Sequence, residues 1–264
     1  MIDAHCHLDA AEFDADRDAA LERARAVGVR AFVLAGVDPE GWLRQSALAR
    51  AHRDVYAGYG IHPWTAAAAP DGATDDLMAA LGDALDSPHL ERPVALGEMG
   101  LDRSPRVPKD SATRQETLFR AQLALARERE LPVILHIVRA HGRALEILAA
   151  DGLPRAAGQV HAYSGSAELV PRYVALGLSL SFGAAVTRPA CARAARAVPP
   201  ERLLVETDAP DQPPPARAKT RNEPAFIDEI VAALAAARGA APADLAALTE
   251  RNARALFALG ASRA

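Results

Sequence analysis

The chain has 264 residues, of which half are hydrophobic and 24% are charged, with a formal net charge of −4. This composition excludes a disordered chain, and the negative charge excludes a global basic surface for nucleic acid. Only two cysteines occur, Cys6 and Cys191, which excludes a disulfide framework. With no signal-like leader and no apolar run of membrane-spanning length, we expect a cytoplasmic protein without membrane contact or an evident obligate protein partner.

Short apolar runs alternate with alanine-rich segments of helical period along the whole chain. The runs predict eight strands, at residues 2–8, 31–35, 55–61, 93–98, 132–136, 158–161, 178–182 and 202–206. Helices are predicted at 14–27, 39–52, 74–85, 111–130, 139–150, 166–176, 189–198, about 224–238 and about 242–259.

Eight strand-then-helix units predict an α/β fold, a (β/α)8 TIM barrel that residues 1–264 form as a single domain. The apolar runs support this fold, because parallel strands covered on both faces are continuously hydrophobic. An open doubly wound sheet is the alternative, but no glycine-rich turn follows the first strand.

The first predicted strand carries two histidines, His5 and His7, two residues apart. Side chains alternate along a strand, so both imidazoles lie on one face and Cys6 on the other. Two neighbouring imidazoles can chelate a divalent metal. The alternative is two incidental polar residues, so the prediction of a metal site depends on partners elsewhere in the chain.

Such partners follow at the carboxyl ends of other predicted strands. Glu98, His136 and His161 each end a predicted strand, and Asp208 follows the last strand by two residues. Each has a structural alternative: a buried hydrogen-bonded histidine, a capping glutamate, or an Asx-turn aspartate. Barrel enzymes build their active sites at this rim, however, so six such residues together predict one shared site.

Four histidines and two carboxylates are enough to hold two divalent metal ions. Mixed nitrogen and oxygen ligation favours zinc, with magnesium or manganese as alternatives for activity. Paired metals commonly serve the hydrolysis of phosphate esters, in which one carboxylate bridges the ions and the nucleophile is a metal-activated water.

The motifs along the chain resemble those of the TatD family of metal-dependent deoxyribonucleases, within the amidohydrolase-like barrels. They occur in family order and span nearly the whole chain. The matching segments are Asp3-Ala4-His5-Cys6-His7-Leu8-Asp9, Gly60-Ile61-His62-Pro63, Gly97-Glu98-Met99-Gly100-Leu101-Asp102, Leu131-Pro132-Val133-Ile134-Leu135-His136, His161-Ala162-Tyr163-Ser164-Gly165-Ser166, Glu206-Thr207-Asp208-Ala209-Pro210 and Arg221-Asn222-Glu223-Pro224.

The resemblance implies a role for each ligand. One metal is held by His5, His7 and Asp208. The other metal is held by His136 and His161.

Two of the implied roles are catalytic. Glu98 is the carboxylate that bridges both metals, in place of the carboxylated lysine that is common in other amidohydrolase-like barrels. Asp208 also orients or deprotonates the nucleophilic water.

The expected substrate contacts each have a structural alternative. His62 contacts a phosphate or a leaving group, or it is a structural histidine before a proline turn. Ser164 helps to hold an anion at a helix N-terminus, or it is an ordinary N-cap. Arg221 binds phosphate or braces the loop that carries Asp208. Asp102 hydrogen-bonds a ligand histidine or is a turn residue.

One departure from the family pattern affects a phosphate contact. Many relatives carry an arginine two residues after the histidine of the fifth strand, where this chain has Val138, followed by Arg139. Whether Arg139 replaces the family contact stays open.

We therefore predict a divalent-metal-dependent phosphodiesterase, an exodeoxyribonuclease whose substrate is DNA or a small phosphodiester. A short single-stranded end fits the net negative charge better than a duplex does. The first alternative is a metal-dependent hydrolase of amides or esters, including lactones and aminoacyl esters, at the same site. The second is a non-catalytic barrel that binds a partner.

Overall fold

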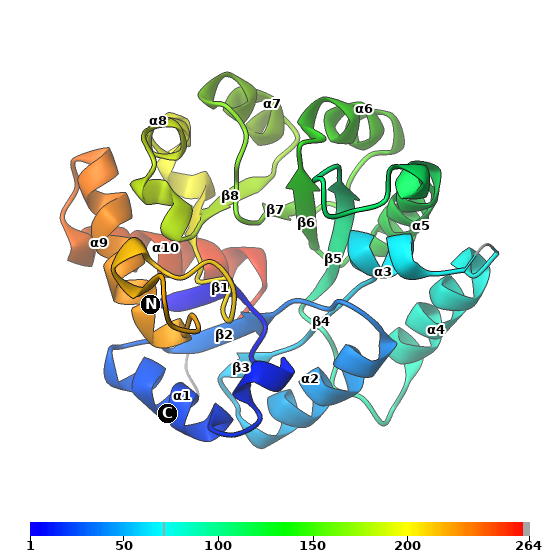
Figure 1. The fold of residues 1–264 in the computed structure, drawn as a ribbon, viewed down its shortest axis with the longest axis horizontal. Coiled ribbons are helices and arrows are strands. Elements are labelled where there is room, and N and C mark those ends of the chain that lie inside the picture. The colour runs from blue at the N-terminus through cyan, green and yellow to red at the C-terminus, as the bar shows by residue number, and fades with distance from the viewer. Residues whose placement is uncertain (71, 261–264) are drawn as a thin grey trace.

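Parallel strands surround a common axis, and helices cover them on the outside (Figure 1). The computed structural model describes residues 1–70 and 72–260. The strands are β1 (Ile2–Cys6), β2 (Ala31–Leu34), β3 (Val55–Tyr56), β4 (Gly58–Tyr59), β5 (Ala95–Asp102), β6 (Val133–Val138), β7 (Gly158–Val160), β8 (Ser179–Phe182) and β9 (Leu203–Val205). The α-helices are α1 (Arg17–Ala26), α2 (Pro39–Ala51), α3 (Pro63–Ala68), α4 (Thr74–Asp86), α5 (Ala112–Arg129), α6 (His141–Asp151), α7 (Val170–Ala175), α8 (Pro189–Ala197), α9 (Ile227–Arg238) and α10 (Pro242–Leu256).

The strands pair in chain order, and the ring closes between its first and last members. β1, β2 and β3 form one parallel run, and β4 to β9 form another. β3 and β4 are two pieces of the predicted strand at 55–61. At the closure, the Asp208 N–H donates to the His5 carbonyl at 3.0 Å, and the His7 N–H donates to the Ala209 carbonyl at 2.7 Å. The predicted (β/α)8 barrel is confirmed.

The backbone segments just after β2 and β4 come close to β5 beneath the site. The Glu98 N–H donates to the Gly36 carbonyl at 2.8 Å, and the Gly36 N–H donates to the Gly97 carbonyl at 2.9 Å. A Cβ added to Gly60 would lie 2.4 Å from the Gly97 carbonyl carbon, so only glycine fits at Gly60. This convergence fixes the backbone of Glu98 beside the end of β2.

Capping signals in the sequence explain where several helices begin and end. The Asp38 carboxylate accepts a hydrogen bond from the Gly41 N–H at 2.7 Å, and Pro39 occupies the first turn of α2. Gly239 ends α9 in a left-handed conformation with φ of 66°. The His62 side chain caps α3 by accepting from the Trp64 N–H.

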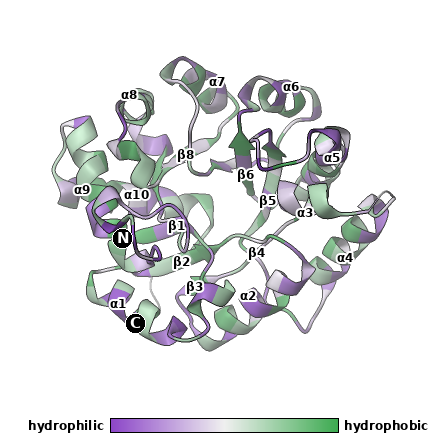
Figure 2. Ribbon diagram, viewed as in Figure 1, coloured by the Kyte–Doolittle hydropathy of each residue, from purple (hydrophilic) through white to green (hydrophobic). Residues whose placement is uncertain are grey.

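Two hydrophobic clusters stabilise the barrel. The larger lies between the strands and the surrounding helices, where Phe32, Phe119 and Phe182 are fully buried. The smaller joins residues of β1, β2, β5, β6 and β9 to Phe257 and Leu259 beyond α10. Figure 2 shows hydrophobic stretches along the strands, as on β6, and hydrophilic stretches on the outer helices. Burial of these aliphatic and aromatic side chains is the main favourable contribution to folding.

Some predicted boundaries are wrong where they concern the site. β5 continues to Asp102 and β6 to Val138, so Glu98 and His136 lie inside their strands rather than at the ends. The helix predicted at 14–27 begins only at Arg17, after a 3-10 turn. The short helix α3 was not predicted, because six residues carry too little helical periodicity to detect.

Among residues 1–70 and 72–260, no single helix has the length and apolar character needed to cross a membrane. Pro224–Arg238 and Pro242–Leu256 meet the criterion only as a pair bent by 105°.

Candidate metal centre

The carboxyl ends of the strands surround a cavity of about 810 Å³. Of the six predicted ligands, five line this cavity, and His5 lies fully buried directly behind His7. The five are His7, Glu98, His136, His161 and Asp208. All six predicted ligands therefore come together, although Asp208 lies more than 200 residues along the chain from His5.

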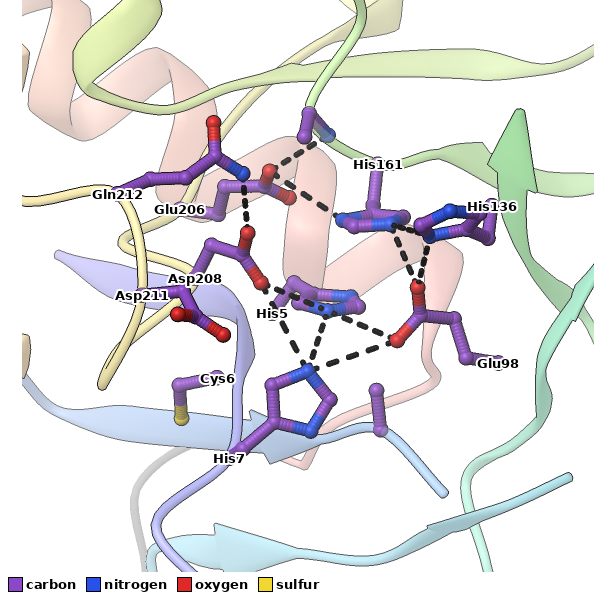
Figure 3. A network of polar contacts seen from close by, with 12 residues as sticks. His5, Cys6, His7, Glu98, His136, His161, Glu206, Asp208, Asp211 and Gln212 are labelled. Carbon is purple, nitrogen blue, oxygen red and sulfur yellow. Dashed lines mark hydrogen bonds and ion pairs between the residues drawn. The ribbon is translucent and has the colours of Figure 1, made fainter. Parts of the chain in front are cut away.

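The first cluster consists of His5, His7 and Asp208, and a carboxylate oxygen of Glu98 faces it. The Nε2 atoms of His5 and His7 lie 3.2 Å apart. Asp208 Oδ1 lies 3.4 Å from the His5 Nε2 and 3.7 Å from the His7 Nε2. Glu98 Oε2 lies 3.4 and 3.5 Å from the same two nitrogens. The donor atoms therefore point toward one common centre, as Figure 3 shows.

The second cluster lies on the other side of Glu98. Glu98 Oε1 lies 2.7 Å from His136 Nδ1 and 2.7 Å from His161 Nε2. Those two nitrogens lie 3.1 Å apart. His62 Nε2 completes this cluster, 3.3 Å from Glu98 Oε1 and 3.2 Å from His136 Nδ1. Glu98 thus presents one oxygen to each cluster (Figure 3).

A carboxylate behind His136 fixes the orientation of its ring. Asp102 Oδ2 contacts His136 Nε2 at 3.2 Å, so it can accept the proton of this nitrogen and orient the ring with Nδ1 toward Glu98, where a bound cation would take the Nδ1 lone pair. The same oxygen accepts a hydrogen bond from the Trp64 indole N–H at 2.7 Å. Asp102 also accepts from the Ser104 N–H, so both of its oxygens are satisfied. Asp102 contacts a candidate ligand histidine, as the first of its two expected roles requires.

His62 differs from the other histidines in its protonation. Its Nδ1 accepts a hydrogen bond from the Trp64 backbone N–H at 3.0 Å. Burial lowers the pKa of His62 to about 4, so the neutral ring carries its single proton on Nε2. Its Nε2 is therefore a hydrogen-bond donor directed at the second cluster rather than a lone pair available to a metal. His62 caps a helix and faces the site at once, so both of its expected roles are compatible.

Glu206 is a buried carboxylate that lies behind His161. Its Oε1 is 3.7 Å from His161 Nδ1 and accepts from the Ala162 N–H at 2.6 Å, and its Oε2 accepts from the Ser181 hydroxyl at 2.5 Å. Glu206 is not among the site residues predicted from the sequence. A signal was present, because Glu206 precedes Asp208 by two residues at the end of an apolar strand.

The site holds its carboxylates as anions. Burial alone would raise the pKa of Asp208, but the contact with His5 and the nearby charge of His161 hold the pKa at about 2. Burial likewise opposes ionisation of Glu98, yet the surrounding histidines keep the pKa of Glu98 well below its ordinary value. The carboxylates in turn raise the pKa of His5 to about 9 against the effect of burial. Two ionised, buried carboxylates make this cavity favourable for cations.

The remaining expected contacts lie farther from the clusters. Ser164 is exposed and lines the cavity. Arg221 lies outside it, where its guanidinium donates to Asp16 at 2.7 and 3.0 Å and to Glu223 at 2.9 Å and stacks over Phe13. Of the two roles expected of Arg221, these contacts match bracing of the loop after β9 rather than binding of a phosphate.

The position of the missing family arginine is apolar in this structure. Val138 lines the cavity, whereas Arg139 is exposed and is not among the described residues that line it.

The donor set fits two divalent cations. Two pairs of imidazole nitrogens face each other at 3.2 and 3.1 Å, next to carboxylate oxygens. Facing ring nitrogens can share at most one hydrogen bond, whereas a cation between them satisfies both lone pairs. Histidine nitrogen with carboxylate oxygen is the ligand set of zinc, manganese and iron sites.

Comparison with known proteins gives consistent matches along the chain. The family model described as TatD-related DNase matches residues 2–258. The chain is 34% identical over 262 residues to a Bacillus subtilis protein described as an uncharacterized metal-dependent hydrolase, YabD, with 97% of this chain and 98% of that protein covered. It is 35% identical over 274 residues to the 3′-5′ ssDNA/RNA exonuclease TatD of Cronobacter sakazakii, with both chains fully covered.

Solved structures agree with the sequence matches. The crystal structure of YjjV, a TatD homologue from Escherichia coli K12, superposes with a TM-score of 0.90 at 32% identity and covers 98% of both chains. A TatD-family hydrolase from Entamoeba histolytica superposes with a TM-score of 0.81 at 18% identity, covering 97% of both chains, and supports the fold alone.

Proposed function

The chain belongs to the family of TatD-related DNases, and on that premise we propose that it is a phosphodiesterase that shortens single-stranded DNA or RNA from the 3′ end. As a member of this family it is a metal-dependent hydrolase. The finer activity is supported by the name of the Cronobacter relative, a 3′-5′ ssDNA/RNA exonuclease, which matches over the full length of both chains.

The observation that carries the proposal is the position of Glu98 between two histidine clusters. One carboxylate oxygen faces His5 and His7, and the other faces His136 and His161. A carboxylate shared between two clusters is the arrangement expected of a bridging ligand in two-metal phosphoryl transfer. We propose that His5, His7 and Asp208 hold one cation, and that His136 and His161 hold the other.

When bound, the cations supply activation of water and neutralisation of the charge on the scissile phosphate. The protein's own residues supply orientation and hydrogen bonds. Asp208 is an ionised acceptor at the cavity wall, and the Gln212 amide donates to its second oxygen, so the carboxylate can orient a water molecule. The His62 Nε2–H is a fixed donor toward the second cluster, where it can stabilise negative charge on a phosphate oxygen.

A single-stranded terminus fits this site better than a duplex does. The net charge of −4 provides no general attraction for the DNA backbone. The cavity of about 810 Å³ is within the usual size range of small-molecule sites, and it opens at the barrel rim. We propose that residues 1–264 act as one domain, because strands from both ends of the chain supply the ligands.

The experiment uses protein freed of metal by a chelator and reloaded with magnesium, manganese or zinc. Single-stranded DNA and RNA labelled at the 3′ or the 5′ end are then followed by gel electrophoresis, beside a lactone and an aminoacyl ester. We expect stepwise loss from the 3′ end that requires added metal. Glu98→Gln should reduce turnover by at least about 1,000-fold because it removes the charge shared by both clusters.

The matched control is Glu146→Gln, the same change at an exposed carboxylate on α6, which should keep full activity. Hydrolysis that survives complete metal removal, or that persists in Glu98→Gln, would contradict the proposal. Faster turnover of the lactone or the aminoacyl ester than of any phosphodiester would favour the alternative ester hydrolase.

A further inference from the structure

One large apolar side chain is exposed at the edge of the metal centre. The Trp64 side chain is 46% exposed, and it lines the same cavity as His62 and His136. Only Val27 and Leu43 are other exposed large hydrophobic residues in the described part of the chain, and neither lines this cavity. An exposed aromatic side chain in a binding cavity indicates a contact surface for a ligand.

The indole ring of Trp64 is held in one orientation. Its N–H donates to Asp102 Oδ2 at 2.7 Å, the oxygen that also contacts His136. Its ring centroid lies 5.0 Å from the His62 ring at an interplanar angle of 82° and 6.5 Å from the His136 ring at 68°. Because the ring is already fixed, a planar group that stacks on it loses little further side-chain entropy.

An exposed arginine, Arg106, lines the same cavity. Arg106 follows β5 and is exposed, and its charge acts on Asp211 of the same cavity, but within residues 1–70 and 72–260 it forms no hydrogen bond and no close ion pair. Arg44, which also lines the cavity, instead pairs with Glu40 at 2.7 Å. An exposed arginine that no hydrogen bond or close ion pair holds in place is available to a phosphate group.

We propose that Trp64 is a stacking platform for the base next to the scissile phosphodiester, and that Arg106 contacts a further phosphate of the same strand. The proposal rests on the proposed nuclease function and names how the strand is bound. Stacking suits a substrate of mixed sequence, because every base has a π-face. Stacking also provides affinity for a polyanionic strand, which the net negative charge of the protein does not attract.

Trp64 provides its own spectroscopic probe. The chain has two tryptophans, and the other, Trp42, is only 2% exposed. The metal-loaded protein is titrated with a short single strand whose terminal linkages are phosphorothioates that resist hydrolysis. A second strand is identical except for an abasic 3′-terminal residue. We expect the complete strand to quench the emission of Trp64 and to bind about 10-fold more tightly than the abasic strand.

Two substitutions at Trp64 separate stacking from a merely structural role. Trp64→Leu should remove the quenching and lower affinity for the complete strand about 10-fold, to that of the abasic strand. Trp64→Phe loses the hydrogen bond to Asp102 but keeps a ring, so it should retain most of the preference for the complete strand. The matched control is Leu43→Ala, which removes another exposed apolar side chain, 59% exposed, outside the cavity.

Arg106→Gln should weaken binding of both strands equally and reduce the salt dependence of binding by about one phosphate contact. Arg50→Gln, at an arginine that pairs with Glu91 outside the cavity, is its control. Equal binding of the two strands by the unmodified protein would overturn the platform. The platform would also be overturned if Trp64→Leu and Trp64→Phe each lowered the affinity for the complete strand and for the abasic strand by the same factor. Absence of hydrolysis of any unmodified strand with any metal would instead refute the proposed function.

Discussion

At the scale of single residues, the partner of each imidazole decides what the ring can do. Asp102 binds the outer nitrogen of His136, which leaves Nδ1 facing Glu98. The backbone N–H of Trp64 binds the outer nitrogen of His62, which leaves a proton on Nε2. With a cation in the second cluster, His136 would therefore face it as a lone-pair donor, whereas His62 faces it as a proton donor. The difference arises from an acceptor behind the first ring and a donor behind the second.

Glu206 should tune metal affinity through His161. Glu206→Gln replaces the buried charge 3.7 Å from His161 Nδ1 with a neutral amide, so the imidazole becomes a weaker ligand. We expect metal affinity to fall about 10- to 100-fold, measured by competition with a chromophoric chelator. Ser181→Ala is the control, because it removes a donor to Glu206 but keeps the carboxylate. Unchanged affinity in Glu206→Gln would show that the carboxylate does not act through His161.

His141 should make stability depend on pH. Burial lowers the pKa of His141 to about 4, against a value of 6.5 for an exposed ring. Between pH 6.5 and 4 the unfolded chain binds a proton that the folded protein does not, so stability falls as the pH falls. From pH 6.5 to 5 the loss attributable to His141 should be about 1–2 kcal/mol. This loss of stability should be absent in His141→Gln. Urea unfolding of the metal-free protein at each pH measures the free energy of unfolding.

The control for this pH dependence is Tyr173→Phe. This change removes the hydroxyl that contacts His141 Nδ1 at 2.8 Å but keeps the ring that buries the imidazole. Because burial is the cause of the shift, Tyr173→Phe should retain the pH dependence. Equal slopes for the unmodified protein and His141→Gln would contradict the prediction.

The sequence predicts site residues that can be recognised from a short motif. It does not predict side-chain contacts between segments that are far apart in the chain. The spacing of His5 and His7 alone places both rings on one face, and their nitrogens do lie 3.2 Å apart. The contact of Trp64 with Asp102 spans 38 residues, and that of Ser181 with Glu206 spans 25. Such contacts depend on how strands and loops meet at the rim, which no local pattern encodes.

At the scale of elements, close backbone contacts with neighbouring segments fix the position of β5. It carries Glu98 in its middle, and Gly36, two residues after the end of β2, forms backbone hydrogen bonds with Gly97 and Glu98. β4 ends at Tyr59 just before Gly60, where its chain meets Gly97. The position of the shared carboxylate is therefore set by backbone contacts, which are more rigid than side-chain contacts.

Two glycine substitutions test this convergence against a matched site. Gly60→Ala places a Cβ 2.5 Å or less from two backbone atoms of Gly97, which cannot yield as a side chain can. We expect it to reduce the free energy of unfolding by about 3 kcal/mol. Gly82→Ala, inside α4 with no atom within 4 Å of the new Cβ apart from the local helix backbone, should raise it by about 0.5–1 kcal/mol. Urea denaturation measures both, and similar effects would refute the proposed convergence.

Element boundaries were predictable only where apolar periodicity is long. α5, predicted at 111–130, spans Ala112–Arg129, and α4, predicted at 74–85, spans Thr74–Asp86. The strand predicted at 93–98 was cut short because Gly100 and Asp102 are poor strand formers by local preference. In the barrel, Gly100 and Asp102 pair with His136 and Val138, and tertiary pairing overrides that preference.

At the scale of the whole molecule, the site joins the two ends of the barrel. His5 and His7 come from β1 and the residue after it, and Asp208 follows β9. Backbone hydrogen bonds connect these same segments at 2.7 and 3.0 Å. Glu98 and His136 come from the opposite side of the ring, on β5 and β6. A cation held by such ligands would bind the folded barrel far better than the unfolded chain.

Metal should therefore stabilise the barrel, and single substitutions should separate the stabilisation that each cluster contributes. At a metal concentration 100 times the dissociation constant, one site adds about 2.7 kcal/mol to the free energy of unfolding. His7→Ala and His136→Ala each affect one cluster, so each should leave about one bound ion and part of the rise in melting temperature. Glu98→Ala affects both clusters, so it should leave fewer ions and less stabilisation than either. Elemental analysis and thermal melting with and without chelator measure these quantities. A melting temperature that does not respond to metal, or a full loss of both ions in His7→Ala, would show that the clusters are not two sites sharing Glu98.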